Sequence, residues 1–261
     1  MKYFENGRLL LLAGPCVVES RDNVFRIAEG LKKLTENRPV DFVFKASYDK
    51  ANRTSVTSFR GRGIEENLAI LADVRREFDV PVVSDVHESS QVAMAAEVLD
   101  FLQVPAFLCR QTDLLVAAGS TGKPVMVKKG QFAAPEDMEH VVDKVISGGG
   151  GGQIALCERG TTFGYRNLVV DYRSLPIMRQ FAPVVFDGTH SVQRPAGLGG
   201  KSGGDRHMIP YLVRAAAAVG IDGLFLETHF DPDSALSDGP NMLPLEELPA
   251  LLDTVDTLRA V

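Results

Sequence analysis

The sequence has no tryptophan, only three cysteines in 261 residues, and no apolar run long enough to span a bilayer. Three cysteines cannot form a disulfide framework, so we expect a reducing compartment, the cytoplasm. The apolar run at residues 9–13 is too short for the core of a signal peptide. A net charge of −6 argues against a general attraction to nucleic acid or to anionic lipid. The composition therefore predicts a soluble protein whose partners are small molecules, with no nucleic-acid or membrane partner.

Short apolar segments alternate with amphipathic segments of helix length, after a short polar lead-in at residues 1–7. The predicted strands are residues 9–13, 42–44, 80–83, 101–104, 124–127, 153–157, 183–186 and 223–226. The predicted helices are residues 21–36, 65–78, 89–99, 110–119, 135–147, 172–181, 206–219 and 245–258. Parallel strands with crossover helices account for this order. The pattern predicts an α/β fold, a (β/α)₈ TIM barrel forming a single domain over residues 1–261.

An open doubly wound sheet is the alternative arrangement of such units. It would call for a glycine fingerprint after the first strand, and the sequence GPCVVES at residues 14–20 is not one. Five consecutive glycines at residues 148–152 suggest a flexible loop, and the strand–helix pattern continues unchanged beyond them. The glycine-rich residues 191–205 are expected to form a mobile loop at the active site.

Unusual residues fall at or just beyond the ends of successive predicted strands. They are Cys16, Lys45, Asp85, Gln103, Lys128, Arg159, His190 and Glu227. A barrel gathers the carboxyl ends of its strands at one face, where the catalytic residues of this fold lie. Polar loop residues placed at random would populate both faces equally. The pattern therefore predicts one active site at the C-terminal mouth of the barrel.

Cationic side chains from several strands converge on this predicted mouth. They are Lys45, Lys50, Arg53, Lys128 and Arg159. Lysine supplies a point charge, and arginine supplies a planar fork that fits phosphate with two hydrogen bonds. Lys129 follows Lys128 on the opposite side of its strand and is expected at the surface. Five converging cations in an acidic protein indicate a strongly anionic ligand, such as two phosphates or a phosphate and a carboxylate.

A second group of residues is suited to a metal ion. Cys16, His190 and Glu227 follow the first, seventh and eighth predicted strands, which become neighbours when the barrel closes. Asp238, in the loop after the last strand, can reach the same place. A thiolate, an imidazole and two carboxylates suit a borderline divalent ion such as Zn²⁺, Fe²⁺ or Mn²⁺. For Cys16 alone, a buried small apolar side chain is an equally good interpretation, and we expect that role for the other two cysteines.

Eight motifs occur in order along nearly the whole chain. They are AGPCVVES (13–20), FKASYDKANRTS (44–55), SDVHE (84–88), LQVPAFLCRQTDL (102–114), VKKGQF (127–132), LCERGTTFGY (156–165), FDGTHSVQ (186–193) and LETHFDPDSALSDGPNMLPL (226–245). Together they resemble the 3-deoxy-D-manno-octulosonate 8-phosphate synthases. The most specific is the Lys-Ala-Asn-Arg-Thr run at residues 50–54. The related 3-deoxy-D-arabino-heptulosonate 7-phosphate synthases, which use erythrose 4-phosphate, tend to carry Lys-Pro-Arg-Thr there and are the nearest alternative.

The resemblance implies an aldol-like condensation that supplies a lipopolysaccharide precursor. Carbon 3 of phosphoenolpyruvate would attack the aldehyde of arabinose 5-phosphate, water would add at carbon 2, and phosphate would leave with cleavage of its C–O bond. The products would be the eight-carbon sugar acid phosphate and inorganic phosphate. The family is typically homotetrameric, so the resemblance also implies a homotetramer. A catalytically inactive barrel that binds sugar phosphates is a remote alternative, because the full set of cations and candidate ligands argues against it.

The resemblance also implies roles for individual residues. Phosphoenolpyruvate would be held by Lys45, Lys50, Gln103, Ala106, Phe107, Lys128 and Arg159. Arabinose 5-phosphate would be held by Asn52, Arg53 and Thr54, and by Arg110 from a neighbouring subunit.

Members of the family that work without metal carry asparagine in place of the cysteine. Cys16 therefore implies the metal-dependent group, with the ligands Cys16, His190, Glu227 and Asp238. The metal would orient or polarise the aldehyde or a bound water. The candidates for catalytic and proton-transfer roles are Lys50, Asp85, His87 and Asp238.

Overall fold

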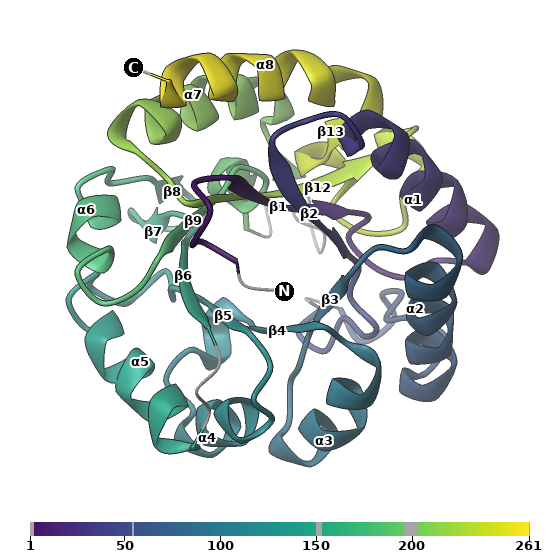
Figure 1. The fold of residues 1–261 in the computed structure, drawn as a ribbon, viewed down its shortest axis with the longest axis horizontal. Helices are drawn as coiled ribbons and strands as arrows, with labels where there is room; N and C mark the ends of the chain where they lie inside the picture. The colour runs from purple at the N-terminus through teal and green to yellow at the C-terminus, as the bar shows by residue number, and fades with distance from the viewer. Residues whose placement is uncertain (1–2, 54, 150–152, 196–202, 261) are drawn as a thin grey trace.

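The computed structural model describes residues 3–53, 55–149, 153–195 and 203–260. Within them, eight parallel strands form a central ring, and helices surround it (Figure 1). The strands of the ring are β1 (Leu9–Gly14), β2 (Val40–Lys45), β3 (Val82–Asp85), β4 (Phe101–Val104), β5 (Val125–Lys128), β6 (Ile154–Glu158), β9 (Val184–Asp187) and β12 (Gly223–His229). The helices are α1 (Arg21–Thr35), α2 (Ile64–Phe78), α3 (Ser89–Val98), α4 (Thr112–Ser120), α5 (Met138–Ser147), α6 (Ser174–Met178), α7 (Ile209–Val219) and α8 (Leu248–Arg259).

The ring closes because β12 pairs with β1 as well as with β9. Leu12 lies opposite Phe225 and Gly14 lies opposite Glu227 in this last parallel pairing. The short strand β13 (Leu243–Pro244) adds to the end of β12. Closure confirms the predicted (β/α)₈ barrel and excludes the open doubly wound sheet, which would leave two free edges.

Three predicted helices begin three residues later than expected. The first, α5, starts at Met138 and not at Pro135, and residues before it form turns. The other two are α7 and α8, which are preceded by the 3₁₀ turns η3 (Arg206–Met208) and η6 (Leu245–Glu247). In both cases a proline stands in the first turn of the α-helix, where its missing N–H is not needed for a hydrogen bond. The sixth helix, α6, is shorter than the predicted residues 172–181.

Successive strand residues point alternately into two apolar layers. Inside the ring lie side chains such as Leu10, Leu12 and Phe225, and between the ring and the helices lie side chains such as Leu9 and Leu11. Both faces of each strand are therefore buried, as expected for a parallel sheet covered by helices. The cysteines that were expected to act as small apolar side chains, Cys109 and Cys157, are both fully buried.

The N-terminal segment closes the barrel at the start of the strands. Tyr3 is only 3% exposed, and its ring lies 5.5 Å from that of Phe101, the first residue of β4. The Tyr3 N–H donates to Gln153 Oε1 at 2.7 Å, and Gln153 Nε2 donates to the Tyr3 carbonyl at 2.6 Å. Burial raises the pKa of Tyr3 to about 12. Tyr3 of the polar lead-in is thus part of the core, whereas residues 5–7 are exposed, and Figure 1 shows the segment turning from β1 towards the centre of the barrel.

The last residue of α8 lies at this same end of the barrel. Arg259 Nη2 donates to the Gly7 carbonyl at 3.2 Å, just ahead of β1. The first and last units of the barrel are therefore joined by a side-chain contact as well as by the β1–β12 pairing.

At the other end of the barrel, two small hairpins extend beyond the strands. One pairs β7 (Thr161–Thr162) with β8 (Leu168–Val169), and the other pairs β10 (Gln193–Arg194) with β11 (Gly203–Gly204). The predicted flexible glycine run, the predicted mobile loop and Thr54 fall wholly or partly outside the described residues. Among the helices that are described, none combines the length and apolar character needed to cross a membrane.

Candidate active site

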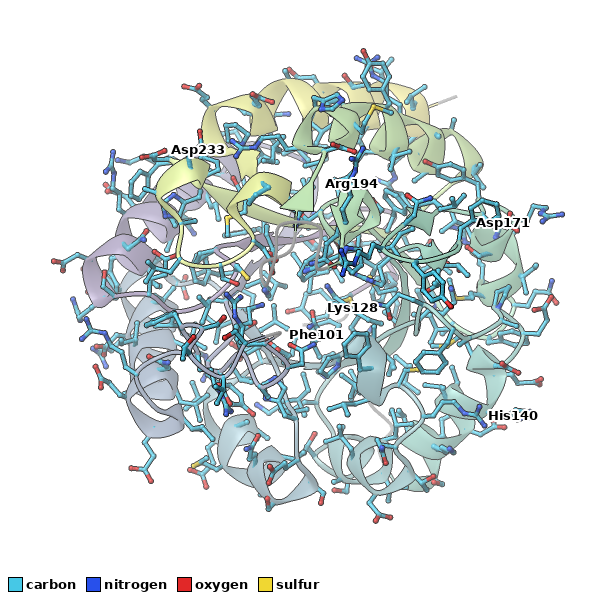
Figure 2. All side chains as sticks on the ribbon, turned by 180° about the vertical axis from the view of Figure 1, so that it is seen from behind. Phe101, Lys128, His140, Asp171, Arg194 and Asp233 are labelled. Atoms are coloured by element: carbon cyan, nitrogen blue, oxygen red, sulfur yellow. The ribbon has the colours of Figure 1, made fainter. Side chains whose placement is uncertain are left out.

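A cavity of about 460 Å³ opens at the C-terminal mouth of the barrel. The predicted site residues that line it are Lys45, Lys50, Asn52, Arg53, Asp85, Gln103, Ala106, Phe107, Lys128, Arg159, His190, Glu227 and Asp238. Figure 2 views the face opposite to that of Figure 1 and places Lys128 near the barrel axis, whereas His140 and Asp171 lie towards the rim. The structure therefore brings together residues that lie up to about 190 positions apart in the sequence, from Lys45 to Asp238.

Of the predicted residues that the structure describes, three do not line the cavity wall. Cys16 lies fully buried beside it, and His87 contacts the wall residue Asp85. Arg110 is exposed, and its carbonyl accepts a hydrogen bond from Lys144. Arg110 does not line this cavity in the single chain, and its role in the site of a neighbouring subunit stays a prediction.

Glu227 is the centre of charge at the bottom of the cavity. Its Oε1 accepts a hydrogen bond from Lys45 Nζ at 2.6 Å and lies 3.7 Å from Lys50 Nζ. Burial alone would raise the pKa of Glu227, but the charges of Lys45 and Lys50 outweigh it and hold this pKa well below its usual range. The Glu227 carboxylate is therefore ionised, although it is completely buried.

The predicted metal ligands gather beside this ion pair. Ligand atoms of Cys16, Glu227 and Asp238 all lie within 4.8 Å of one another, and Cys16 Sγ is 3.2 Å from Asp238 Oδ2. The fourth, His190, has its Nε2 3.8 Å from Glu227 Oε1. Glu227 Oε2 is buried and has no hydrogen-bond partner among the described residues. Burial and then the charge of Glu227 raise the pKa of the Cys16 thiol well above its usual value.

This donor set fits a divalent cation. One sulfur, one imidazole nitrogen and two carboxylates match the preferences of a borderline ion such as Zn²⁺, Fe²⁺ or Mn²⁺. A cation among them would satisfy the free Glu227 oxygen and would favour the thiolate form of Cys16. The four residues come from β12 and from the loops that follow β1, β9 and β12, so the closure of the ring brings them together.

Asp85 and His87 form a second polar pair at the mouth. His87 Nε2 lies 2.8 Å from Asp85 Oδ2, and the ring of Tyr48 packs edge-on against the imidazole at 5.6 Å. Burial alone would raise the pKa of Asp85, but His87 and Lys50 hold it well below its usual range. Asp85 is therefore an ionised carboxylate in the cavity wall, and His87 contacts its Oδ2 from the side away from the cavity.

Two side chains that the sequence did not single out connect the predicted subsites. Ser237 Oγ accepts from Arg53 Nη1 and lies 3.1 Å from Cys16 Sγ. Gln193 Oε1 accepts from Arg159 Nη2 at 3.0 Å, while its Nε2 lies 3.4 Å from Asp238 Oδ1. Both lie within motifs quoted above, at the end of FDGTHSVQ and in the middle of LETHFDPDSALSDGPNMLPL, but serine and glutamine are too common in loops to be assigned a role without coordinates.

The prediction that Lys129 is a surface residue is wrong. Its side chain is 1% exposed and donates to Thr161 Oγ1 at 3.0 Å and to the Ala133 carbonyl at 3.3 Å. Its Nζ also lies 3.5 Å from Glu158 Oε2. The lysine does point away from the cavity, as expected from strand alternation, but the opposite face of a barrel strand is covered by loops and helices and not by solvent.

Comparison with known proteins identifies the family. The model of the DAHP synthetase I family matches residues 4–260. The chain belongs to this family. A curated relative from Desulfatibacillum aliphaticivorans, named 2-dehydro-3-deoxyphosphooctonate aldolase, is 59% identical over 252 residues, which are 96% of this chain and 92% of the relative. A protein of the same name from Geobacter metallireducens is 59% identical over 254 residues, which are 97% of this chain and 93% of the relative. Another from Bartonella tribocorum is 54% identical over 248 residues, which are 95% of this chain and 89% of the relative.

These relatives confirm the resemblance predicted from the motifs, because the name they carry is another name for the octulosonate 8-phosphate synthase. The family description names the heptulosonate (DAHP) synthases, but it applies to the family as a whole. The heptulosonate alternative is therefore supported only at the level of the family.

Proposed function

We infer that this chain condenses phosphoenolpyruvate with D-arabinose 5-phosphate and water to give 3-deoxy-D-manno-octulosonate 8-phosphate and inorganic phosphate. The observation that carries this inference is the convergence of Lys45, Lys50, Arg53, Lys128 and Arg159 in one cavity, in a chain that is 59% identical to proteins named for this activity. Both substrates are phosphorylated, and phosphoenolpyruvate also has a carboxylate, so the cations match the ligands in charge.

Phosphoenolpyruvate is assigned to the deep part of the cavity. Lys45, Lys128 and Arg159 are only 1%, 5% and 3% exposed. Lys45 and Lys128 already meet the carboxylates of Glu227 and Asp187. Arg159 Nη1, however, is buried without a hydrogen-bond partner among the described residues, so an anion at this depth would satisfy it. They are held at the ends of β2, β5 and β6, which are rigid supports. The other proposed contacts of this substrate are Lys50, Gln103, Ala106 and Phe107, all of which line the same cavity. Fixed ammonium and guanidinium groups would stabilise the phosphate as it leaves from carbon 2.

Arabinose 5-phosphate is assigned to the outer part, with Asn52, Arg53 and Thr54. Asn52 and Arg53 line the cavity and are more exposed than the deep cations, so they suit the second substrate to enter. Its phosphate would also meet Arg110 of a neighbouring subunit.

We further propose a homotetramer, and the support for association is an exposed aromatic surface near the mouth. Phe107, Phe132, Phe163 and Tyr165 are 58%, 61%, 71% and 100% exposed in the single chain. They lie on η1 (Ala106–Leu108), on the loop after β5 and between β7 and β8. Exposed apolar side chains in such a number favour a protein contact.

Cys16, His190, Glu227 and Asp238 would hold a divalent ion, which supplies Lewis-acid polarisation of the aldehyde or of a water. Asp85 lines the cavity and would orient a water or a hydroxyl group by accepting its hydrogen bond. Because the low pKa of Asp85 makes it a weak base, His87, at 2.8 Å behind it, is the candidate that would take up the proton. Lys50 and Asp238 are the remaining candidates for proton transfer.

The experiment that tests the function is phosphate release from phosphoenolpyruvate, measured with arabinose 5-phosphate and, separately, with erythrose 4-phosphate. Each reaction is run with and without a chelator. Release with the pentose phosphate alone, abolished by chelator and restored by a divalent ion, is the expected result. Release with the tetrose phosphate alone would replace the proposed acceptor. Release that persists in chelator would refute the metal requirement if metal analysis of the same sample finds no bound ion.

A further inference from the structure

Asp187, the last residue of β9, is completely buried and contacts residues on two sides of the cavity. Its Oδ2 accepts a hydrogen bond from Lys128 Nζ at 2.6 Å and lies 2.8 Å from His190 Nδ1. Its Oδ1 accepts from the backbone N–H groups of Thr189 at 3.0 Å and His190 at 2.8 Å. None of the roles proposed above involves this carboxylate.

The backbone contacts fix the direction of the carboxylate. Because Oδ1 is held by two N–H groups of its own loop, Oδ2 is the oxygen that is presented to the side chains of Lys128 and His190. Three N–H donors, the backbone groups of Thr189 and His190 and the Lys128 ammonium, point at the two oxygens of Asp187. The side chain therefore serves as a carboxylate that only accepts hydrogen bonds.

This arrangement sets the tautomer of His190. An imidazole Nδ1 beside a carboxylate oxygen carries the proton, so Nε2 retains its lone pair. The Nε2 atom is the one that lies near Glu227 Oε1, at 3.8 Å. The ring edge that faces the candidate metal ligands is therefore an acceptor because of the contact made on the opposite edge.

The same oxygen sets the position of Lys128. The ammonium is 3.4 Å from the centre of the Phe225 ring and hydrogen bonded to Asp187, so both contacts restrict a side chain that would otherwise be flexible. Lys128 lines the cavity close to the other deep cations. The carboxylate therefore fixes one of the charges assigned to phosphoenolpyruvate.

We propose that Asp187 is a positioning residue that orients the His190 imidazole for a cation and the Lys128 ammonium for phosphoenolpyruvate through one oxygen atom. This inference deepens the proposed function and rests on it. An asparagine of the same size cannot replace the carboxylate, because one end of its amide is a donor. Whichever way the amide is turned, its NH₂ group faces either two backbone donors or the two side-chain donors.

Isothermal titration of metal-stripped protein tests the proposal. Mn²⁺ binding is measured alone, and phosphoenolpyruvate binding is measured in chelator. We expect Asp187→Asn to weaken Mn²⁺ binding about 10–100-fold, as loss of such an outer partner typically does, and to weaken phosphoenolpyruvate binding at least about fivefold, or 1 kcal/mol. A loss of less than fivefold in either titration overturns the proposal. Wild-type protein that binds no phosphoenolpyruvate would instead refute the proposed function.

Two matched variants test separately the effect on His190 and the effect on Lys128. His190→Ala is expected to lose Mn²⁺ binding and retain phosphoenolpyruvate binding, whereas Lys128→Met is expected to show the reverse. A carboxylate with a purely structural role would not produce both losses in one variant that melts normally.

A second measurement needs no substitution of Asp187, in case that variant does not fold. Nitrogen-15 NMR of histidine-labelled wild-type protein, without metal, reports which ring nitrogen of each neutral imidazole carries the proton. The His190 signal is identified by its absence in His190→Gln. A proton on Nδ1 supports the proposal, and a proton on Nε2 overturns it.

Discussion

Lys45 Nζ lies 2.6 Å from Glu227 Oε1, and the two side chains are 2% and 0% exposed. Their strands, β2 and β12, flank β1 in the ring, so the pair spans the closure of the barrel. It joins a cation assigned to phosphoenolpyruvate with a carboxylate assigned to a metal. In the free protein each group serves as the counter-ion of the other.

This pair predicts a large loss of stability when one partner is removed. Glu227→Gln leaves Lys45 and Lys50 without their nearest carboxylate, so the free energy of unfolding should fall by about 3–5 kcal/mol. Urea unfolding at pH 7 in chelator measures it. The control is Glu29→Gln in the exposed Lys33–Glu29 pair (70% and 55% exposed), where the expected loss is about 1 kcal/mol or less. Equal losses in the two variants would contradict the prediction.

Asp85 predicts a specific dependence of stability on pH. Its pKa in the folded state is held well below the usual range, so its stabilising effect is present above the pKa of the unfolded chain, about 4, and is lost as the pH falls below that value. Between pH 5 and pH 3, the unfolding free energy of the wild type should therefore fall more steeply than that of Asp85→Asn. Urea unfolding at both pH values checks this. Glu65→Gln, in the exposed first turn of α2, serves as the control and should leave the wild-type slope unchanged.

Tyr3 predicts that stability and catalysis can be separated. Tyr3→Ala removes a buried ring at the start of the strands, and by analogy with other buried aromatic residues the unfolding free energy should fall by about 3–5 kcal/mol. The Michaelis constants of both substrates should not change, because the cavity is at the opposite end of the barrel. Tyr211→Ala, at a ring that is 60% exposed, is the matched control for stability. A raised Michaelis constant in folded Tyr3→Ala would show that the two ends are coupled.

Cys16 predicts that metal and activity are lost together. Cys16→Ala removes the only sulfur in the candidate ligand group, so bound Mn²⁺ or Zn²⁺ and phosphate release should fall in parallel. Metal analysis of the purified variant beside the activity assay measures both. Cys157→Ala, a buried cysteine in the interior apolar layer, is the control and should retain the ion. Full activity of Cys16→Ala in chelator would remove Cys16 from the proposed ligands.

Asn52 predicts selective loss of the acceptor sugar. It lies at the outer part of the cavity, away from the buried cations assigned to phosphoenolpyruvate. Asn52→Ala should raise the Michaelis constant of arabinose 5-phosphate by about tenfold, the effect of losing hydrogen bonds worth 1–2 kcal/mol. The affinity for phosphoenolpyruvate, measured by titration, should stay within about twofold of the wild-type value. Unchanged steady-state constants for the pentose phosphate would refute this role.

Much of the site could be predicted from sequence because the fold has a simple rule. A parallel barrel places every strand end at one face, so residues such as Lys128 and His190 could be grouped without knowing any distance. The same rule applied to Asp187, the final residue of β9, but an aspartate directly before a loop is also common as a turn residue. Its role depends on which atoms its two oxygens meet, and that is a property of coordinates alone.

The burial of Lys129 and Tyr3 was not predicted, because a sequence pattern does not show which other segments cover a side chain. The direction of the Lys129 side chain, away from the cavity, was predicted correctly. Its burial was not, because lysine is rarely fully buried and the sequence pattern does not show that Glu158 is its neighbour. Tyr3 stands in a polar segment with no periodicity, so its burial against Phe101 depends on contacts between distant parts of the chain.

The contact between Arg259 and Gly7 brings the last helix next to the segment before β1, so the first and last units of the barrel are neighbours in space. Because β12 also pairs with β1, the neighbours of each strand are fixed only by their cyclic order, and the point at which the chain starts is arbitrary for the barrel. A gene that linked the last helix to the first strand and opened instead at the turn after α4, near Gly122, would encode the same set of strand pairs. The ends of the chain and the chemistry would still be separated by the full height of the barrel.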